Sequence, residues 1–315
     1  MPSILLAIMG WDPKGWERRF RALAPQHDIR VWPDAVGDPD SIHYACVWKP
    51  PAGLLVGFRN LKAIFSLGAG ADDLLADPKL PDVPVVRIVD PDLTMRMTEY
   101  VVLHVLMCHR RQRLYDAQQR ERMWHEHSQP AASEVVVGIM GLGVLGTSAA
   151  QMLQRVGFKV AGWSRTPKTL SGVETFEGAQ ALEPFLRQSE ILVCLLPATP
   201  ATRGIINLDL LRKLRKHGAL QGAYLINAGR GSLQIDADIL AALEEGSLAG
   251  AALDVFPTEP LPIESPLWGH PKLTITPHNA AQAVPQTLAV NVLQQIDRIE
   301  LGHPPENAID RTIGY

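Results

Sequence analysis

Short apolar runs separated by turn residues recur along the first hundred residues of the chain. A run of this length bounded by turn signals is typical of a strand buried on both faces of a parallel sheet. Helix-like or Pro/Gly-rich pieces lie between the runs, and this alternation favours a mostly parallel sheet. We therefore expect an α/β unit over about residues 1–100. Its strands are predicted at residues 4–9, 29–32, 44–48, 63–67 and 85–89.

The same alternation continues in the remainder of the chain, after a segment that contains neither Pro nor Gly. That segment, residues 98–124, predicts a long helix, continuous or broken, which ends before Pro130. At 315 residues the chain is long enough for roughly two domains, each with its own core. Further strands are predicted at 135–140, 158–163, 190–196, 222–226, 250–256 and 273–276. Helices are predicted at 147–156, 208–214, 237–243 and 288–300, the last returning to the first unit.

A glycine turn joins the strand at 135–140 to the helix at 147–156, with the spacing Gly-x-Gly-x-x-Gly. Gly141 would allow the tight turn, Gly143 the close approach of a pyrophosphate, and Gly146 the close packing of helix against strand. The amino end of the helix would then face the phosphates. Glycine turns also occur for purely structural reasons, so the spacing alone is weak evidence. The strand before it and the helix after it favour a dinucleotide site.

The end of the next predicted strand indicates which dinucleotide binds. NAD-binding folds carry an Asp or Glu there, about 20 residues after the glycine turn, for the ribose 2′-hydroxyl. Here the strand ends in Ser164-Arg165-Thr166, and no acidic residue occurs between Glu134 and Glu174. Arg165 can hold a 2′-phosphate with a pair of hydrogen bonds, and Ser164 or Thr166 can donate others. Arg165 is also consistent with a solvated loop charge. The missing acid and the added base together predict NADP(H) as the preferred cofactor, with NAD(H) possible.

Composition and charge narrow the class of protein. With 46% hydrophobic residues, 20% charged residues and a net charge of −3, the chain is typical of a globular protein without a nucleic-acid partner. The amino terminus lacks a basic leader, and no apolar stretch reaches about 18 residues, so we expect neither a signal peptide nor a membrane partner. Cys46, Cys108 and Cys194 lie in apolar segments, without disulfide or metal spacing among Cys and His. We expect a cytoplasmic protein with no metal site.

Three polar residues of catalytic type follow three predicted strands: Arg230, Glu259 and His278. Reduction of a 2-keto acid needs a cation for the substrate carboxylate, which suits the arginine fork. It needs an acid for the carbonyl oxygen, which suits histidine, and a carboxylate that orients that histidine and favours its protonated form. Each residue alone is more typical of a solvated loop or a turn, and spacing does not show that the three converge. Together they make this edge of the sheet the candidate active site.

Two turns of the first unit also follow strands and are candidates for ligand contact. One is Trp48-Lys49-Pro50-Pro51, and the other is the glycine pair Gly68 and Gly70. Ligands of open α/β sheets lie outside the carboxyl ends of the strands. Backbone N–H groups of the glycine pair would suit an anion such as a carboxylate, although the two glycines are equally consistent with a simple turn.

Several long uninterrupted motifs make the sequence resemble the D-isomer-specific 2-hydroxyacid dehydrogenase family, most closely its short glyoxylate/hydroxypyruvate reductase branch. They extend over nearly the whole chain. The motifs are VWKPP (47–51), SLGAGAD (66–72), GIMGLGVLG (138–146), WSRT (163–166), LLPATPATRGIIN (195–207), NAGRG (227–231), LDVFPTEPLP (253–262), SPLW (265–268) and ITPH (275–278).

The resemblance implies a fold class and a domain organisation. It implies an α/β protein with two Rossmann-like domains, each a parallel sheet flanked by helices, and an active-site cleft between them. Residues 1–100 and 284–315 would form the substrate-binding domain, and residues 101–283 the inserted NAD(P)-binding domain. Members of the family are typically cytoplasmic homodimers.

The resemblance also assigns roles to residues at matching positions. Arg230 would bind the substrate carboxylate, His278 would donate the proton, and Glu259 would be the partner of His278. Asn279 departs from the close branch, which more often has an apolar residue there. The substrate would also contact Trp48 and the backbone of Ala69 and Gly70. Cofactor contacts are expected at Gly141, Gly143, Val144, Leu145, Gly146, Ser164, Arg165, Thr166, Leu196, Pro197, Ala228 and Asp254, the last through the nicotinamide carboxamide.

The function that these inferences imply is NADPH-dependent reduction of a small 2-keto acid, glyoxylate to glycolate or hydroxypyruvate to D-glycerate. One alternative is a dehydrogenase for larger 2-keto acids on the same fold. Another is a non-catalytic, nucleotide-sensing scaffold, which the complete set of Arg, Glu and His disfavours.

Overall fold

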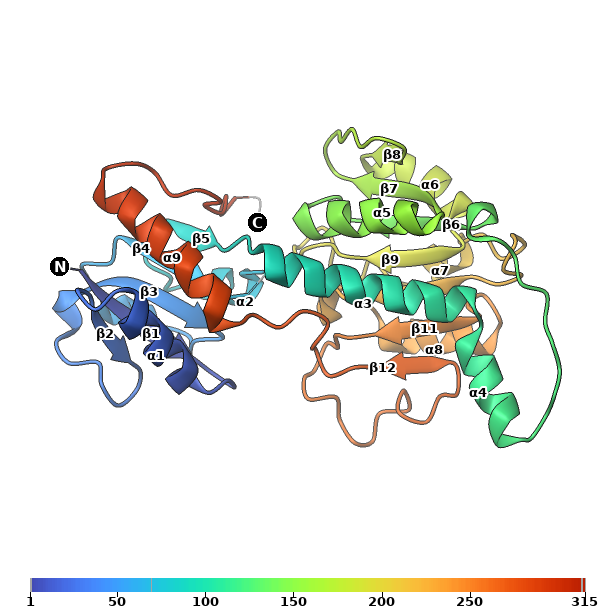
Figure 1. Cartoon of the computed structure of the whole chain (residues 1–315), viewed down its shortest axis with the longest axis horizontal. Coiled ribbons are helices and arrows are strands. Elements are labelled where there is room, and N and C mark those ends of the chain that lie inside the picture. Colours follow the sequence, from blue (N-terminus) through green and yellow to red (C-terminus); the bar gives the residue numbers. More distant parts are fainter. Residues whose placement is uncertain (1, 69, 313, 315) are drawn as a thin grey trace. The chain divides into compact units, whose positions relative to one another are not determined.

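The computed structural model describes residues 2–68, 70–312 and 314, and the chain forms two compact α/β units (Figure 1). The first unit comprises Met1–Leu93 and Gln282–Tyr315, and the second comprises Thr94–Ala281. Each unit has its own sheet and its own hydrophobic clusters. The binding roles assigned to the two parts of the chain stay predictions.

The first unit contains a five-stranded sheet in the order β2-β1-β3-β4-β5, with neighbouring strands parallel. The five predicted strands are therefore confirmed, with bounds that shift by one to a few residues. The strands are β1 (Ser3–Ile8), β2 (Asp28–Val31), β3 (Ile42–Trp48), β4 (Ala63–Ser66) and β5 (Val85–Arg87). The helices are α1 (Pro13–Leu23), α2 (Asp72–Leu75) and α9 (Pro285–Glu300), with 3-10 turns at Pro39–Ser41 and Leu54–Gly57.

Helices α1 and α9 cover one face of this sheet. Trp16 and Phe20 of α1 are buried in the same cluster as Leu288 and Val292 of α9. The closing helix therefore returns to the first unit, as predicted. It begins at Pro285, earlier than predicted, because proline is well accommodated in the first turn of a helix.

The second unit contains a seven-stranded sheet in the order β12-β11-β10-β9-β6-β7-β8, again with parallel neighbours. The strands are β6 (Val136–Met140), β7 (Lys159–Ser164), β8 (Glu174–Glu177), β9 (Ile191–Cys194), β10 (Tyr224–Asn227), β11 (Gly250–Leu253) and β12 (Leu273–Ile275). The helices are α3 (Pro91–His109), α4 (Gln112–Arg120), α5 (Val144–Val156), α6 (Leu182–Gln188), α7 (Leu208–Arg212) and α8 (Asp236–Glu244). Further 3-10 turns lie at Ala132–Glu134, Ala179–Ala181 and Gly231–Leu233.

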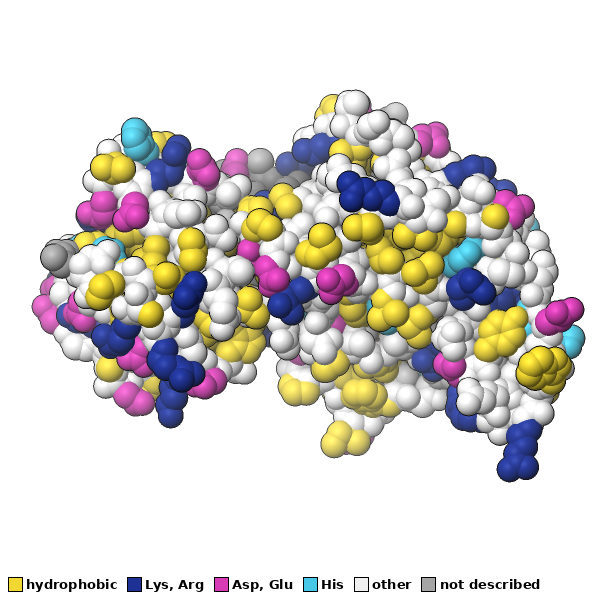
Figure 2. Space-filling model, viewed as in Figure 1, with side chains coloured by type: hydrophobic (Ala, Val, Ile, Leu, Met, Phe, Trp, Pro, Cys, Tyr) yellow, Lys and Arg dark blue, Asp and Glu magenta, His cyan; other side chains and the backbone are white. Residues whose placement is uncertain are grey.

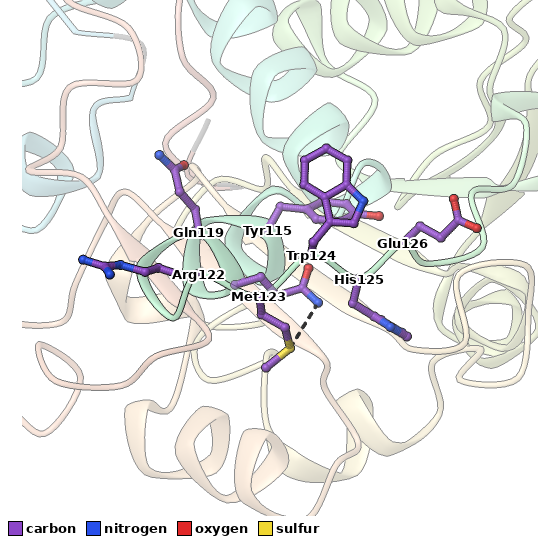
Figure 3. A pocket seen from close by; sticks show the side chains of 8 residues that line it. Tyr115, Gln119, Arg122, Met123, Trp124, His125 and Glu126 are labelled. Atoms are coloured by element: carbon purple, nitrogen blue, oxygen red, sulfur yellow. Dashed lines mark hydrogen bonds between the residues drawn. The ribbon is translucent and has the colours of Figure 1, made fainter.

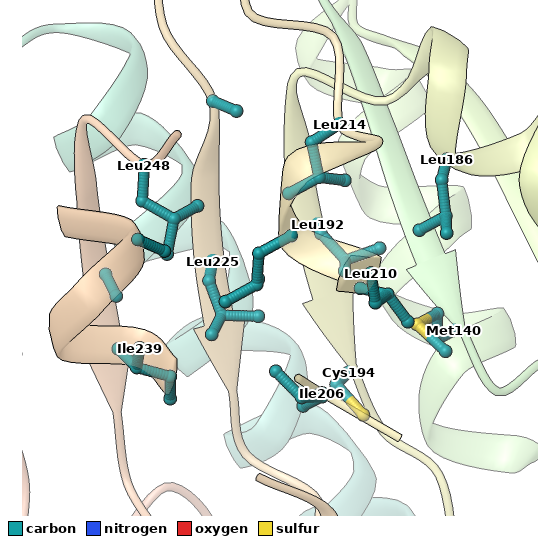
Figure 4. Close-up of a cluster of buried hydrophobic side chains, with 14 of the residues drawn as sticks. Met140, Leu186, Leu192, Cys194, Ile206, Leu210, Leu214, Leu225, Ile239 and Leu248 are labelled. Atoms are coloured by element: carbon teal, nitrogen blue, oxygen red, sulfur yellow. The ribbon is translucent and has the colours of Figure 1, made fainter. Parts of the chain in front are cut away.

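Helices cover both faces of the seven-stranded sheet. Leu186 of α6, Leu210 of α7 and Ile239 of α8 pack with strand residues in one cluster (Figure 4). Val105 of α3 and Leu153 of α5 belong to the cluster on the other face. The central strands are thus buried on both sides, which explains their uninterrupted apolar sequences.

One expectation for this unit needs correction: the helix expected from residue 98 starts at Pro91, which the first turn tolerates. The helix is broken near Arg111, whose φ is +53°, and the prediction allowed for such a break. Strand β8 and helix α6 were not predicted. Strand β8 is an edge strand with mostly exposed polar residues, so no apolar run indicates it.

Candidate active site

The predicted site residues of the second unit follow the carboxyl ends of neighbouring parallel strands. Strands β12, β11, β10, β9 and β6 are consecutive in the sheet, so their carboxyl ends share one edge. The strand order reverses between β6 and β9, because β7 lies on one side of β6 and β9 on the other. In open α/β sheets this switch point is where a dinucleotide binds.

The three glycines after β6 meet different requirements. Gly141 has φ +106°, and a Cβ there would lie 2.8 Å from the carbonyl oxygen of Leu195. A Cβ on Gly146 would lie 1.9 Å from the carbonyl oxygen of Gly141. Among the described residues, none has an atom within 4 Å of a Cβ built on Gly143. Gly141 and Gly146 are thus required by packing, whereas Gly143 faces open space.

Helix α5 begins without a side-chain cap. Its N-cap residue is Gly143, and within the described part of the chain no side chain accepts a hydrogen bond as its cap. The first N–H groups of a helix have no partner inside the helix, and they carry its partial positive charge. An uncapped start beside open space suits an anion such as a pyrophosphate. Val144 is exposed and Leu145 half-buried at this start.

The turn after β7 has an organised interior and an exposed rim. Ser164 is buried, and its hydroxyl donates to the carbonyl oxygen of Thr166 at 2.7 Å. Arg165 and Thr166 are exposed. Because Ser164 donates its proton within the turn, its oxygen can only accept a further hydrogen bond. Arg165 and Thr166 are therefore the candidate donors to a 2′-phosphate.

The turns after β9 and β10 pack closely against each other. A Cβ on Gly229 would lie 2.9 Å from the carbonyl oxygen of Leu196, so glycine permits this approach. The Thr202 hydroxyl donates to the carbonyl oxygen of Pro197 at 2.7 Å and fixes the loop after β9. Thr202 is a positioning residue that the sequence pattern did not indicate. Leu196 and Ala228 are buried.

Arg230 is held between two glycines. The Asn227 side chain accepts a hydrogen bond from the N–H of Gly229 at 3.1 Å and donates one to the carbonyl oxygen of Arg230 at 3.2 Å. A Cβ on Gly231 would lie 1.9 Å from the carbonyl carbon of Phe256, so the chain after β10 runs against the chain after β11. The guanidinium of Arg230 donates to the carbonyl oxygen of Gly229 at 2.9 Å, and the side chain is half-buried.

Glu259 and His278 form a hydrogen-bonded pair. Nδ1 of His278 lies 2.8 Å from Oε2 of Glu259, and the other carboxylate oxygen accepts from the N–H of Phe256 at 3.1 Å. The side chains are 31% and 24% exposed, so a ligand can reach them. The structure therefore brings together two of the three predicted catalytic residues. The third predicted residue, Arg230, follows β10, and β10 is the strand next to β11 in the sheet.

Asp254 is 1% exposed and organises the loop that carries His278. Its Oδ1 accepts from the N–H of Asn279 at 3.0 Å and from the Thr276 hydroxyl at 2.6 Å. Its Oδ2 accepts from the N–H of Ala280 at 3.0 Å. These bonds give Asp254 a structural role at this loop, beside the cofactor contact that the resemblance implies. Asn279 is exposed.

The predicted substrate residues of the first unit lie at the ends of β3 and β4. The rings of Trp48 and Trp11 are stacked, with centroids 4.4 Å apart. A Cβ on Gly68 would lie 2.0 Å from the Trp48 ring, so this glycine makes room for the indole. The Ser66 hydroxyl donates to the carbonyl oxygen of Gly70 at 2.8 Å. Ala69 lies outside the described residues, and Trp11 was not singled out from the sequence.

The remaining predictions concern metal, membrane and cysteine chemistry. Within residues 2–68, 70–312 and 314 there is no group of three or more His, Cys, Asp or Glu that could hold a metal ion. No helix in the same ranges is long and apolar enough to span a membrane. Burial raises the pKa of the Cys194 thiol to about 12 and that of Cys108 to about 12, which makes both poor nucleophiles. On the face seen in Figure 2, acidic and basic side chains are interspersed over each unit.

A pocket of about 500 Å³ lies at the end of α4, formed by residues other than those predicted for the site (Figure 3). Trp124 beside it is fully exposed, and Met123 is exposed as well. Exposed large apolar side chains of this kind often mark a surface that another protein covers. The pocket is lined by Tyr115, Gln118, Gln119, Arg122, Met123, Trp124, His125 and Glu126.

Comparison with known proteins identifies the family of the chain. A family model described as D-isomer specific 2-hydroxyacid dehydrogenase, NAD binding domain, matches residues 102–280. Glyoxylate/hydroxypyruvate reductase A from Escherichia fergusonii is 42% identical, over 99% of this chain and 100% of that protein.

Two crystal structures are also similar over the whole chain. An NADPH-dependent glyoxylate/hydroxypyruvate reductase from Sinorhizobium meliloti, in complex with NADP and sulfate, superimposes with a TM-score of 0.95 at 43% identity, covering 100% of both chains. A D-isomer specific 2-hydroxyacid dehydrogenase from Xanthobacter autotrophicus Py2, in complex with NADPH and MES, gives 0.95 at 43% identity, covering 100% of this chain and 99% of that one. The chain belongs to the D-isomer specific 2-hydroxyacid dehydrogenase family.

Proposed function

We propose that this protein reduces small 2-keto acids, glyoxylate to glycolate and hydroxypyruvate to D-glycerate, with NADPH as the preferred cofactor. The observation that carries the proposal is the 2.8 Å hydrogen bond between His278 and Glu259, after two strands of a sheet whose central turn is open at Gly143. The similarity to reductases of this specificity supports the choice of substrate.

The residues around the glycine turn fit a phosphorylated dinucleotide. Gly143 leaves space for a phosphate beside the uncapped start of α5. The exposed Arg165 after β7 offers a positive charge where NAD-preferring folds have an acid. Similar structures hold NADP or NADPH. When bound, the cofactor supplies the hydride that reduces the carbonyl carbon.

The side chains at the strand ends have complementary tasks in this reaction. Arg230 binds the substrate carboxylate and draws electron density from the adjacent carbonyl. Because Nδ1 of His278 bonds to Glu259, its Nε2 is the nitrogen that gives a proton to the carbonyl oxygen. A C–H bond forms at the carbon, the carbonyl π bond breaks, and the oxygen becomes a hydroxyl. Glu259 orients the imidazole and stabilises its protonated form.

Replacement of the proposed proton donor tests the function. For His278→Ala we expect kcat with glyoxylate and NADPH to fall by about 10²- to 10⁴-fold, while NADPH still binds. Rates come from NADPH absorbance, and binding comes from nucleotide fluorescence. His303→Ala, which removes an exposed histidine of the first unit, is the control and should keep the wild-type rate. Unchanged turnover in His278→Ala would contradict the assignment.

A substrate panel tests the specificity. Glyoxylate, hydroxypyruvate, phenylpyruvate and a branched 2-keto acid are compared with NADPH and with NADH. We expect the highest kcat/KM for one of the two small acids with NADPH. A clear preference for the larger acids would replace the substrate proposal and leave the fold and the reaction type unchanged. Whether Trp48 and Gly70 bind the substrate stays a prediction.

We further propose that the chain is a cytoplasmic homodimer and that the second copy covers the surface around Trp124. The exposed indole lines a pocket together with one basic residue, Arg122, and one acidic residue, Glu126, so a second copy could pair these opposite charges. A twofold dimer requires such a surface on each copy. Light scattering should give a dimer for the wild type and a smaller mass for Trp124→Ser. A monomeric wild type would refute the proposal.

A further inference from the structure

The loop that carries His278 has a backbone conformation that needs support. His278 has φ +51°, in the left-handed region that residues other than glycine seldom adopt. Its own N–H donates to the carbonyl oxygen of Asp254 at 2.8 Å. The next two N–H groups, of Asn279 and Ala280, donate to the Asp254 carboxylate. The position of His278 therefore depends on where the Asp254 carboxylate is held.

One hydroxyl group, that of Thr276, bonds to this carboxylate and is itself bonded to Tyr100 of α3. The Thr276 hydroxyl lies 2.6 Å from Oδ1 of Asp254 and 2.9 Å from the Tyr100 hydroxyl. Tyr100 is 9% exposed, and its ring packs on that of His104, with centroids 4.2 Å apart. The chain of bonds thus runs from a buried helix residue to the loop of the proposed proton donor.

The donors and acceptors allow one direction in this chain. A carboxylate only accepts hydrogen bonds, so Thr276 gives its single proton to Asp254. The Thr276 oxygen then accepts, and Tyr100 is its donor. Each hydroxyl donates its proton to the next group, which fixes the orientation of both side chains. The bond from Thr276 to the Asp254 carboxylate is charge-assisted, and such bonds are stronger than bonds between neutral groups.

The ionisable groups around this chain keep that direction stable. Burial raises the pKa of Tyr100 above its usual range, and the Asp254 carboxylate adds to this, so the phenol keeps its proton. Burial also lowers the pKa of His104, against the opposing effect of Asp254, which favours the neutral ring next to Tyr100. On the other side of the loop, Glu259 is the carboxylate that faces His278.

We propose that Thr276 and Tyr100 are positioning residues for His278, acting through Asp254. The inference rests on the proposed function of His278 as proton donor. Loss of the Thr276 hydroxyl frees one side of the Asp254 carboxylate and loosens the loop from 278 to 280. His278 then spends less time at 2.8 Å from Glu259 and in reach of the substrate oxygen. A small displacement of a reacting group lowers the rate of the chemical step far more than it lowers binding.

Three variants and one matched control test the proposal. Thr276→Val removes the hydroxyl and keeps the shape of the side chain, and Thr276→Ser restores the hydroxyl. Tyr100→Phe removes only the outer bond. Thr274→Val is the control, because Thr274 lies on β12 two residues before Thr276, and its hydroxyl accepts from Arg113, at 3.1 Å, instead of bonding to Asp254. Each variant is assayed for thermal unfolding, and for kcat and KM with glyoxylate.

For Thr276→Val we expect kcat to fall about 10- to 100-fold, with little change in the KM for glyoxylate, because Arg230 is untouched. Thr276→Ser should recover most of the rate. Tyr100→Phe should lose about threefold, and Thr274→Val should match the wild type.

The outcomes separate this inference from the function on which it rests. A wild-type protein that reduces neither small keto acid overturns the function. A wild-type protein that does so, with Thr276→Val equally fast, overturns the inference alone. Failure of Thr276→Ser to recover, or an equal loss in Thr274→Val, also overturns it, because either result indicates general damage to β12.

Discussion

The first strand of each unit occupies the same place in its sheet, yet the turns that follow the two strands are built differently. Strand β1 pairs with β2 on one side and β3 on the other, and β6 pairs with β7 and β9. Both therefore lie at the point where the strand order reverses. Ligands of open α/β sheets bind at such points, so topology alone would allow a nucleotide at either turn.

In the first unit, a residue of the turn after β1 caps the helix α1 that follows it. The carboxylate of Asp12 accepts a hydrogen bond from the N–H of Lys14 at 3.0 Å, and Pro13 at the first position has no N–H to satisfy. Trp11 stacks on Trp16 and on Trp48, which covers the turn with aromatic rings. A negative charge already stands at the start of α1.

In the second unit, the equivalent turn after β6 gives helix α5 no side-chain cap among the described residues. Gly143 has no side chain to cap α5, and among the described residues none has an atom within 4 Å of where a Cβ would be. We therefore expect a phosphate to bind at the start of α5 and not at that of α1, because α1 carries one short, charged side chain that α5 lacks. Fold topology provides the place, and the turn residues decide whether a ligand can use it.

The largest effect is expected when α5 is given the cap that α1 has, because this removes the difference between the two helix starts. Gly143 has φ −77° and ψ −165°, an extended conformation that aspartate adopts without strain. In Gly143→Asp the carboxylate should bond to the first N–H groups of α5 and repel the pyrophosphate. We expect the Kd for NADPH, measured by nucleotide fluorescence, to rise about 100-fold or more.

The stability of Gly143→Asp distinguishes capping from damage. The melting temperature without cofactor should stay the same or rise slightly, because aspartate caps a helix at least as well as glycine. Gly143→Asn, which can cap without a full charge, should weaken NADPH binding less. A variant that unfolds at lower temperature, or one that binds NADPH normally, would contradict the interpretation of Gly143 as the phosphate-facing residue.

A smaller effect on NADPH binding is expected when the exposed Arg165, after β7, is replaced. Removing the guanidinium in Arg165→Ala should raise the KM for NADPH about 10- to 100-fold and leave the KM for NADH nearly unchanged, because only NADPH carries the 2′-phosphate. Steady-state rates with both cofactors measure the ratio. Lys159→Ala, at the other end of β7 and also exposed, is the control for general surface charge. An equal change with both cofactors would contradict the role of Arg165.

The sheets and the glycine turn could be predicted because their signals are local. Buried parallel strands are continuous apolar runs, and β1 and β6 are fully buried along their lengths. Gly141 and Gly146 are required by contacts within a few residues or with the adjacent strand end. Strand β8 lacks such a run, because it pairs on one side only and stays largely exposed.

Contacts between distant segments left no such signal. Glu259 and His278 are 19 residues apart in the chain, and no spacing rule predicts that their side chains meet. The family resemblance paired them, whereas the residues alone left each consistent with a solvated loop. The bond between Tyr100 and Thr276 joins positions 176 residues apart. Tyr100 belongs to α3 and Thr276 follows the end of β12, and no spacing in the sequence indicates that their hydroxyl groups meet.

The smallest effect is expected when the cap of the first unit is removed. In Asp12→Ala the N–H of Lys14 loses its acceptor, which should lower the free energy of unfolding by about 1 kcal/mol and the melting temperature by a few degrees. NADPH affinity should stay at the wild-type value, because Pro13, the first residue of α1, still offers no N–H and Trp11 in the turn still stacks on Trp16 and Trp48. Asp12→Asn, which keeps an acceptor oxygen, should retain most of the stability. If Asp12→Ala instead weakened NADPH binding as much as Gly143→Asp, the two turns would not be functionally distinct, and the side chain at the helix start would not be what separates them.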